Sequence, residues 1–136
     1  MERQCGGTIQ LSSVPTRSLV LVLTENLEYP ALFDCHVTVV VTEEARIHLS
    51  FLKMDIRSYG ACSGDFVTII DSRPLSKDTF SFQDRLSRRH CGVKRPEPIA
   101  SSGNNVTIRF VSDAHVNGHG FSLLLTAFHE GNLQAS

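Results

Sequence analysis

The sequence predicts an all-β fold, an antiparallel β-sandwich that carries two disulfides. Three observations lead to this prediction. Apolar and polar residues alternate over several short segments, which is the period of a strand with one buried face. Gly, Pro, Asn and Ser separate these segments at short intervals. Four cysteines stand far apart, at positions 5, 35, 62 and 91, with no CxxC pair among them. Many short segments that are rich in β-branched residues and separated by turn residues favour a sandwich over an α/β fold.

The strands can be placed one by one from the alternation. Val37, Val39 and Val41 share one face of their segment, and Ile47 and Leu49 share one face of the next. The segment 85–90 is the only weak indication of a helix. The expected strands, in chain order, are 18–23, 35–41, 46–52, 65–70, 79–82, 105–111 and 120–128.

Length and charge set limits on the class of protein. The chain has 136 residues, which we interpret as one domain over 5–128 followed by a flexible tail over 129–136. A net charge of −1 gives no reason to expect nucleic acid as a partner. The longest apolar run, Leu19 to Leu23, is far too short to insert into a membrane. Met1 is followed at once by two charged residues, so we expect a mature domain or a fragment with an initiator Met.

The even number of cysteines indicates two disulfides formed in an oxidising compartment. The alternative is four buried thiols in a cytosolic domain. Four cysteines permit three connectivities, and their spacing alone does not choose among them. The absence of CxxC pairs argues against a structural zinc site.

The order of short motifs along the chain resembles that of the CUB domain family, from Cys5 to about Phe128. This resemblance implies a compact antiparallel β-sandwich, the CUB-like jelly roll, with the first cysteine paired to the second and the third to the fourth. The implied disulfides are therefore Cys5–Cys35 and Cys62–Cys91. The motifs, in order, are "CGG" from Cys5, "EYP" at 28–30, "FLKMDI" before Cys62, "DFVTIID" after it, "CG" at 91–92, "SSGNNVTIRFVSD" at 101–113 and "GF" at 120–121.

The resemblance also implies a candidate site at one end of the sandwich. Many CUB domains bind calcium there through one Glu and two Asp, and often contact a lysine of a protein partner at the same place. Asp65 and Asp113 match the two Asp, but Arg57 stands at the Glu position. We therefore expect no cofactor, with calcium possible but disfavoured, and we predict that Arg57 bridges the two carboxylates. The alternative is that Arg57 points into water. Asp55, two residues earlier, would lie on the same strand face about 7 Å away.

Three further features lie in predicted loops. His115 and His119 have H-x-x-x-H spacing, but Gly118 and Gly120 indicate a loop, so exposed histidines are a better interpretation than a metal site. The sequon at Asn105 predicts a glycosylated surface position. A basic patch is either a solvated face or a surface for sulfated glycans or an acidic protein. Its members are Arg85, Arg88, Arg89, Lys94 and Arg95.

No catalytic motif supports an enzyme, because GxSxG, HExxH and Gly-rich phosphate loops are absent. We predict a non-enzymatic extracellular protein–protein interaction module, part of a larger secreted or cell-surface protein. It would bind a protein partner through the loops around Arg57, Asp65, Asp113 and His115. One alternative is a spermadhesin-like glycan- or heparin-binding domain that uses loop 85–95. Another is an accessory domain of an extracellular protease.

Overall fold

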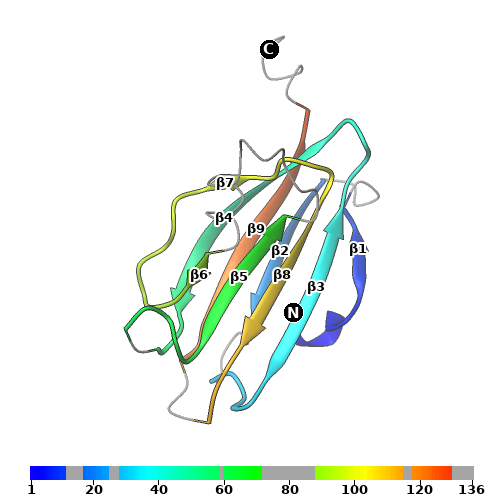
Figure 1. The fold of residues 1–136 in the computed structure, drawn as a ribbon. Helices are drawn as coiled ribbons and strands as arrows, with labels where there is room; N and C mark the ends of the chain where they lie inside the picture. Colours follow the sequence, from blue (N-terminus) through cyan, green and yellow to red (C-terminus); the bar gives the residue numbers. More distant parts are fainter. Residues whose placement is uncertain (12–16, 25–27, 59, 72–87, 115–117, 130–136) are drawn as a thin grey trace.

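The computed structural model describes residues 1–11, 17–24, 28–58, 60–71, 88–114 and 118–129. In these residues the chain forms a two-layer β-sandwich (Figure 1). The described elements are η1 (Glu2–Gln4), β1 (Thr8–Gln10), β2 (Ser18–Leu23), β3 (Asp34–Val40), β4 (Arg46–Asp55), β5 (Phe66–Asp71), β6 (Arg89–His90), β7 (Ile99–Ala100), β8 (Asn105–Val111) and β9 (Gly120–Phe128).

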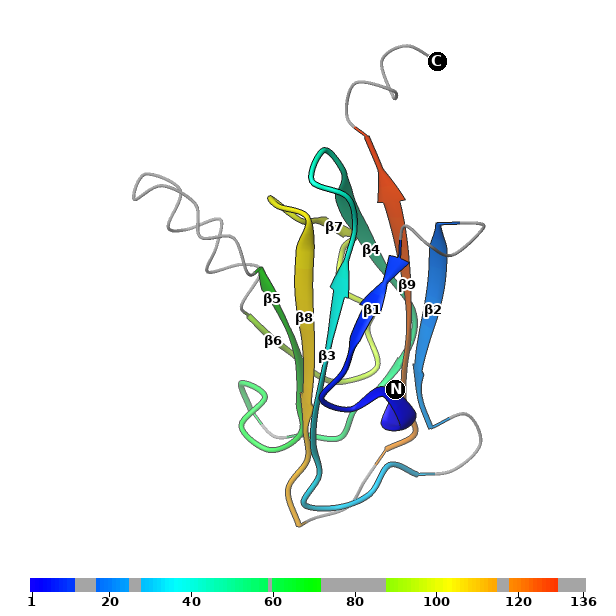
Figure 2. The same ribbon diagram turned by 90° about the vertical axis from the view of Figure 1, so that its right-hand side faces the viewer.

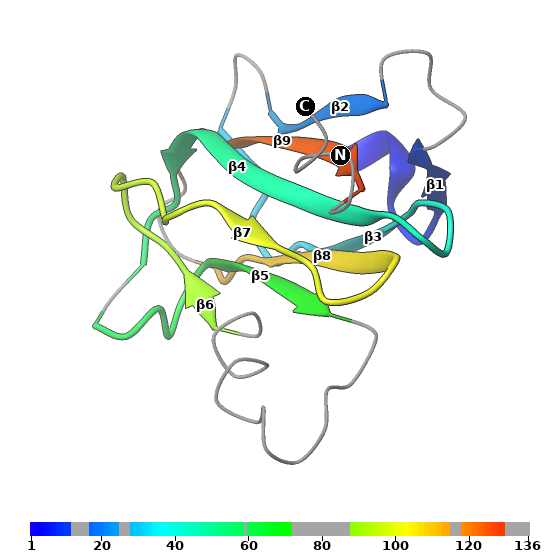
Figure 3. The ribbon, with the colours of Figure 1, turned by 90° about the horizontal axis from the view of Figure 1, so that it is seen from above.

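One sheet has the strand order β1-β3-β8-β5-β6, and the other has the order β2-β9-β4-β7. Seen from above, the two sheets form separate layers that face each other (Figure 3). All neighbouring strands are antiparallel except β1 and β3, which pair in parallel. The predicted β-sandwich is confirmed. β6 and β7 are the edge strands of their sheets on one side of the sandwich.

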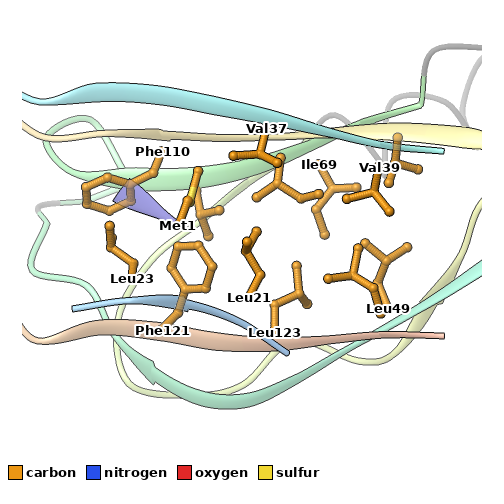
Figure 4. Packing of buried hydrophobic residues seen from close by; sticks show 14 of the residues in the cluster. Met1, Leu21, Leu23, Val37, Val39, Leu49, Ile69, Phe110, Phe121 and Leu123 are labelled. Carbon is orange, nitrogen blue, oxygen red and sulfur yellow. The ribbon is translucent and has the colours of Figure 1, made fainter. Parts of the chain in front are cut away.

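The core lies between the sheets and is made by the alternation that the sequence shows. Val37 and Val39 of β3 and Phe110 of β8 point from one sheet toward Leu21 and Leu123 of the other (Figure 4). All five side chains are at most 1 % exposed. Burying an aliphatic or aromatic side chain of this size contributes about 1.5–3 kcal/mol, so these positions hold the layers together.

Both disulfides implied by the CUB resemblance are confirmed. Cys5 is bonded to Cys35, and Cys62 is bonded to Cys91. The sequence separations are 30 and 29 residues, so each bond contributes about 3–4 kcal/mol in the chain-entropy account of disulfides. The first bond ties the amino-terminal segment to β3. The second joins the loop after β4 to the end of β6.

Some predictions about elements were wrong or incomplete. The weak helix prediction over 85–90 fails at Arg89 and His90, which form strand β6 paired with Val67 and Thr68 of β5. Pairing with a neighbour, rather than local periodicity, creates so short a strand. β1 and β7 were not expected at all; Figure 2 looks onto the side where β1 and β2 lie in different sheets. The predicted strand 79–82 and the tail beyond 129 lie outside the described residues.

The strand pairing brings several loops to one end of the sandwich. Asp34 at the start of β3 and Phe66 at the start of β5 both lie opposite Val111 at the end of β8. In the other sheet, Asp55 at the end of β4 lies opposite Gly120 at the start of β9. These strand ends meet at the lower end of the molecule in Figure 1, which we call the loop end. No helix among the described residues has the length and apolarity needed to cross a bilayer.

Candidate functional site

Tyr29 organises the loop end from inside. Its side chain is 1 % exposed, and its ring packs edge-on against Phe110 with centroids 4.8 Å apart. The Tyr29 hydroxyl donates to Oδ2 of Asp65 at 2.5 Å and accepts the backbone N–H of Arg57 at 2.9 Å. Burial and the bond to Asp65 raise the pKa of Tyr29, so the phenol stays protonated. The Tyr29 hydroxyl therefore ties its own loop to both ends of the loop between β4 and β5. The sequence analysis included Tyr29 only as part of the motif "EYP" and did not predict this role. The signal that could have indicated it is that a buried Tyr needs a partner for its hydroxyl.

Asp65 is fully buried beneath this surface. Its Oδ1 accepts the backbone N–H of Asp113 at 2.8 Å, while its Oδ2 accepts the Tyr29 hydroxyl. Burial raises the pKa of Asp65, and the nearby Asp113 carboxyl raises it further, against the lowering effect of the hydrogen bonds from Tyr29 and the Asp113 backbone. The structure thus brings the two predicted aspartates together. Because Asp65 has no exposed surface, it positions the loops and does not touch a partner itself.

The predicted bridge from Arg57 to Asp65 and Asp113 was wrong. The Arg57 guanidinium pairs with Asp55 instead, with Nε 3.3 Å from Oδ1, and 59 % of the side chain is exposed. The reason is local geometry. Asp55 and Arg57 are two residues apart on an extended chain, so their side chains leave on the same side. Asp65, in contrast, is reached only from the interior, where Tyr29 holds it.

Asp55 is the centre of the exposed charges at the loop end. Besides Arg57, its carboxylate accepts the backbone N–H of His119 at 3.1 Å and lies 2.8 Å from His119 Nδ1. Burial alone would raise the pKa of Asp55, but the bonds from His119 and the charge of Arg57 outweigh burial and lower it. The carboxylate therefore stays ionised and fixes both neighbours. His119 is 62 % exposed beside Gly120. His115 lies outside the described residues, so the H-x-x-x-H pair has no structural outcome.

The donor set that the described residues offer at the loop end does not fit calcium. Calcium takes six to eight oxygen ligands, and the CUB resemblance implies three carboxylates for it. Arg57 occupies the third acidic position, and Asp55 already binds Arg57 and His119. Among the described residues no group of three or more His, Cys, Asp or Glu could hold a metal ion.

Leu32 is an apolar side chain presented at this end, and sequence analysis missed it. It is 78 % exposed and has a left-handed backbone with φ of +53°. Its backbone N–H donates to the carbonyl of Asp113 at 2.9 Å, which links its turn to the end of β8. A leucine gains nothing locally from this conformation, which costs a side-chain-bearing residue about 1–2 kcal/mol. Only a backbone angle that the sequence does not reveal distinguishes Leu32 from other surface leucines.

The basic patch lies outside the loop end, along β6 and in the loop that follows β6. Exposed there are Arg88, Arg89, Lys94 and Arg95, and all four line a groove between β6 and β7. Arg85 lies outside the described residues. Asn105 begins β8 and is half-buried, with its amide donating to Asn104 at 3.0 Å. Glycosylation of Asn105 stays a prediction.

A two-disulfide, two-sheet sandwich with its loops gathered at one end defines a class of small binding module. The family model described as CUB domain matches residues 5–124. The chain belongs to the CUB domain family. This membership, together with the disulfides, supports an extracellular protein-interaction module.

Three human proteins are among its curated relatives. The chain is 40 % identical to tumor necrosis factor-inducible gene 6 protein over 82 residues, which are 60 % of the chain and 27 % of that protein. It is 30 % identical to tolloid-like protein 1 over 108 residues, 79 % of the chain and 10 % of that protein. It is 34 % identical to procollagen C-endopeptidase enhancer 1 over 95 residues, 70 % of the chain and 20 % of that protein. The chain thus spans about a quarter or less of the length of these relatives.

Solved structures show the same fold. The CUB1-EGF-CUB2 domain of human MASP-1/3 aligns with a TM-score of 0.70 and 23 % identity over 91 % of the chain and 42 % of that structure. The MASP-1 CUB2 domain bound to Ca²⁺ aligns with a TM-score of 0.67 and 21 % identity over 90 % of the chain and 98 % of that domain. At this level of identity the likeness concerns the fold alone.

The Arg57–Asp55 pairing predicts a small effect of Arg57→Ala. The free energy of unfolding should change by less than about 1 kcal/mol, because exposed ion pairs are screened and entropically costly. The backbone N–H that bonds to Tyr29 is kept in the variant. Urea unfolding followed by circular dichroism measures the change. Arg57→Pro, which removes that N–H, should be much less stable. A loss above about 2 kcal/mol in Arg57→Ala would instead indicate that the guanidinium compensates the buried Asp65.

Proposed function

We propose that this CUB domain binds an extracellular protein partner through the loop end, with Leu32 as the apolar anchor and Arg57 and His119 in the polar rim. The single observation that supports the proposal best is the exposed, left-handed Leu32, which lies at the same end of the sandwich as the charges fixed by Asp55. Protein interfaces commonly combine a buried apolar anchor with a hydrogen-bonding rim. The surface contains no catalytic arrangement among the described residues, which fits a binding role.

The turn that carries Leu32 is held rigidly. Ser112 accepts the backbone N–H of Phe33 through its hydroxyl at 2.9 Å and donates that hydroxyl to the carbonyl of Pro30 at 2.6 Å. Together with the bond from Leu32 to Asp113, these contacts fix the unfavourable backbone angle. A fixed anchor loses little conformational freedom when it is covered, which favours binding. The partner should therefore offer an apolar pocket for a leucine.

The exposed charges at the loop end indicate what the partner should present beside that pocket. Arg57 and His119 are both more than half exposed, and both contact the single carboxylate of Asp55. The Arg57 guanidinium keeps further N–H groups beyond the one that contacts Asp55, and the second ring nitrogen of His119 can make one more hydrogen bond. Carboxylates on the partner, beside the apolar pocket, would satisfy these donors.

Substitution of Leu32 tests the proposal. Leu32→Gly should keep or slightly raise the melting temperature, because glycine adopts a positive φ without strain. The same change should abolish partner binding. The immobilised domain would be exposed to extracellular fluid, and captured proteins would be quantified by mass spectrometry for wild type, Leu32→Gly and Arg57→Ala. Leu52→Ser serves as the control, because Leu52 is 42 % exposed on the outer face of β4.

A protein set that Leu32→Gly loses and Leu52→Ser retains supports the loop end as the binding surface. Identical capture by all variants, at equal stability, would show that the partner binds elsewhere.

Two narrower roles are also proposals. Residence in a secreted protease as an accessory domain is suggested by the likeness to tolloid-like protein 1, of which the chain covers 10 %. Heparin or sulfated-glycan binding is suggested by the basic patch, four of whose members are exposed around one groove. We further propose that the parent protein is secreted or carries this domain in an ectodomain, since both cysteine pairs are oxidised.

A further inference from the structure

A groove separates the edges of the two sheets at β6 and β7. The chain leaves β6, crosses from one layer to the other through residues 91–98, and enters β7; both edge strands and this crossing are visible in Figure 3. The groove has a volume of about 680 Å³, within the range of roughly 300–1,000 Å³ typical of ligand sites. Its walls are the Cys62–Cys91 disulfide, β6, the crossing segment and β7.

The rim of the groove is basic. Arg88, Lys94 and Arg95 are exposed, and none of them forms an ion pair with a carboxylate among the described residues. Glu97 is the one acidic residue among the described lining residues. These cations are therefore available to an anionic ligand and need not break internal pairs first. Charge of one sign around a concave surface also concentrates the field and attracts anions.

Arg89 is a pre-positioned member of this rim. Its guanidinium carbon lies 4.1 Å from the centroid of the Phe66 ring, and its NH1 donates to the carbonyl of Cys62 at 3.4 Å. The flat face of the guanidinium thus stacks on an aromatic ring while other N–H groups stay open. Because Phe66 begins β5 and Cys62 is held by its disulfide, the position of Arg89 depends on rigid parts of the fold.

The floor of the groove is apolar, and this distinguishes it from a simple charged patch. Pro96, Pro98, Ile99 and Ala100 line it together with the disulfide. His90 also lines the groove, and its Nε2 is buried with no hydrogen-bond partner among the described residues. Burial and the charge of Arg88 lower the pKa of His90, so the ring is neutral at physiological pH. A neutral imidazole accepts or donates one further hydrogen bond at that atom.

We infer that this groove binds an extended acidic segment of a protein partner, one in which carboxylates alternate with apolar or aromatic side chains. The carboxylates would pair with Arg88, Lys94 and Arg95, and the apolar side chains would cover the proline and isoleucine floor. A sulfated glycan would engage the rim but leave much of this floor without apolar contact, so the lining favours the peptide. The inference rests on the proposed function, that the domain binds proteins, and adds a second contact surface to it.

The groove and the loop end adjoin each other. Ile56 and Gly92 form an isolated antiparallel bridge, with backbone N···O distances of 3.1 and 2.8 Å. Arg57 follows directly after Ile56, and Lys94 lies two residues after Gly92. One partner can therefore place an apolar pocket over Leu32 and run an acidic segment into the groove. The two surfaces still differ in their residues, so they can be tested separately.

The test uses the full chain and three soluble probes at physiological salt. They are a random copolymer of glutamate and tyrosine, poly-glutamate of equal length, and heparin. Binding to the fluorescently labelled domain is followed by anisotropy. We expect the copolymer to bind at least tenfold more tightly than poly-glutamate, because only the copolymer covers the apolar floor; tenfold corresponds to about 1.4 kcal/mol. Arg88→Glu/Arg95→Glu should weaken copolymer binding by at least tenfold without changing the melting temperature.

Two controls keep the outcomes apart. Arg3→Glu/Lys53→Glu makes the same change in net charge at two exposed positions outside the groove lining, and it should leave copolymer binding within about twofold of wild type. Leu32→Gly should also leave it unchanged, since Leu32 belongs to the loop end. If heparin binds more tightly than the copolymer, the ligand of the groove is a glycan and not a peptide. If no probe binds, or if both charge-reversal pairs weaken binding equally, the groove is not the binding site that we infer. Neither result affects the separate test of Leu32.

Discussion

Asp65→Ala is expected to lower the free energy of unfolding by about 3–5 kcal/mol at neutral pH. The variant leaves the Tyr29 hydroxyl and the Asp113 backbone N–H without their shared acceptor. Each unsatisfied buried polar group costs about 1–3 kcal/mol, and the lost side-chain volume adds to this. Chemical unfolding at pH 7 measures the loss. The same variant should release the loop end, seen as faster amide hydrogen exchange in the turn around Leu32.

Tyr29→Phe and Asp65→Asn separate the contributions to this effect. Tyr29→Phe removes one hydrogen bond to the carboxylate and one to the Arg57 N–H, but it fills the same space, so we expect a loss of about 2–3 kcal/mol. Asp65→Asn keeps an acceptor for Asp113 and should lose about 1 kcal/mol. If Asp65→Ala were as stable as Asp65→Asn, the buried carboxylate would not be what ties the loops together.

The raised pKa of Asp65 also predicts a pH dependence. Between the unfolded pKa near 3.8 and the higher native pKa, the native state holds a proton that the unfolded state has released. The stability contribution of Asp65 is therefore fully present below the unfolded pKa and declines as pH rises through the native pKa. Asp34 and Asp55 have lowered pKa values and act in the opposite sense, so their contribution is lost as pH falls below the unfolded value. Asp65→Asn should remove only the decline toward neutral pH.

The sandwich could be predicted because one-sided burial leaves a signature in the chain. Val37, Val39 and Ile108 are all buried, and all belong to segments in which apolar residues recur every second position. The disulfide pairing could be predicted only from the CUB resemblance, because cysteine spacing fits three connectivities. β6 escaped prediction for the converse reason: two residues are too few to show a period, and only the pairing of Arg89 and His90 with β5 makes them a strand.

The site was harder to predict because it depends on which side chains are buried. The motif match named Asp65 and Asp113 correctly as neighbours, but it could not show that Asp65 is enclosed and therefore out of reach of Arg57. The pairing of Arg57 with Asp55 was not predicted, although the two-residue period of an extended chain places both side chains on one side. The strained turn of Leu32 depends on a backbone angle that tertiary hydrogen bonds impose. The basic groove depends on how loop 91–98 crosses between sheets, which no local pattern encodes.

Gly120 is a position at the loop end where neither the space nor the backbone angle suits a side chain. It begins β9 with φ of +95°, and it lies opposite Asp55 in the register of the two strands. A Cβ added there would lie 2.1 Å from the carbonyl oxygen of Leu23 and 2.9 Å from the hydroxyl of Thr24. Real Cβ atoms essentially never approach a backbone oxygen so closely. The close approach of β2 to the start of β9 therefore requires glycine, for space as well as for its backbone angle.

Gly120→Ala is accordingly expected to lower the free energy of unfolding by about 3 kcal/mol or more, since it adds the cost of overpacking to that of a left-handed residue. Gly60→Ala is the matched control. Gly60 has φ of +47° and nothing within 4 Å of an added Cβ, so only the backbone cost of about 1–2 kcal/mol applies. Urea unfolding of both variants measures the difference directly. Because β2 must move away from β9 to admit the methyl group, His119 should also lose its bonds to Asp55, and its ring signals should shift in NMR spectra. Equal losses in the two variants would mean that the backbone angle alone, and not the contact with Leu23, makes glycine necessary at the start of β9.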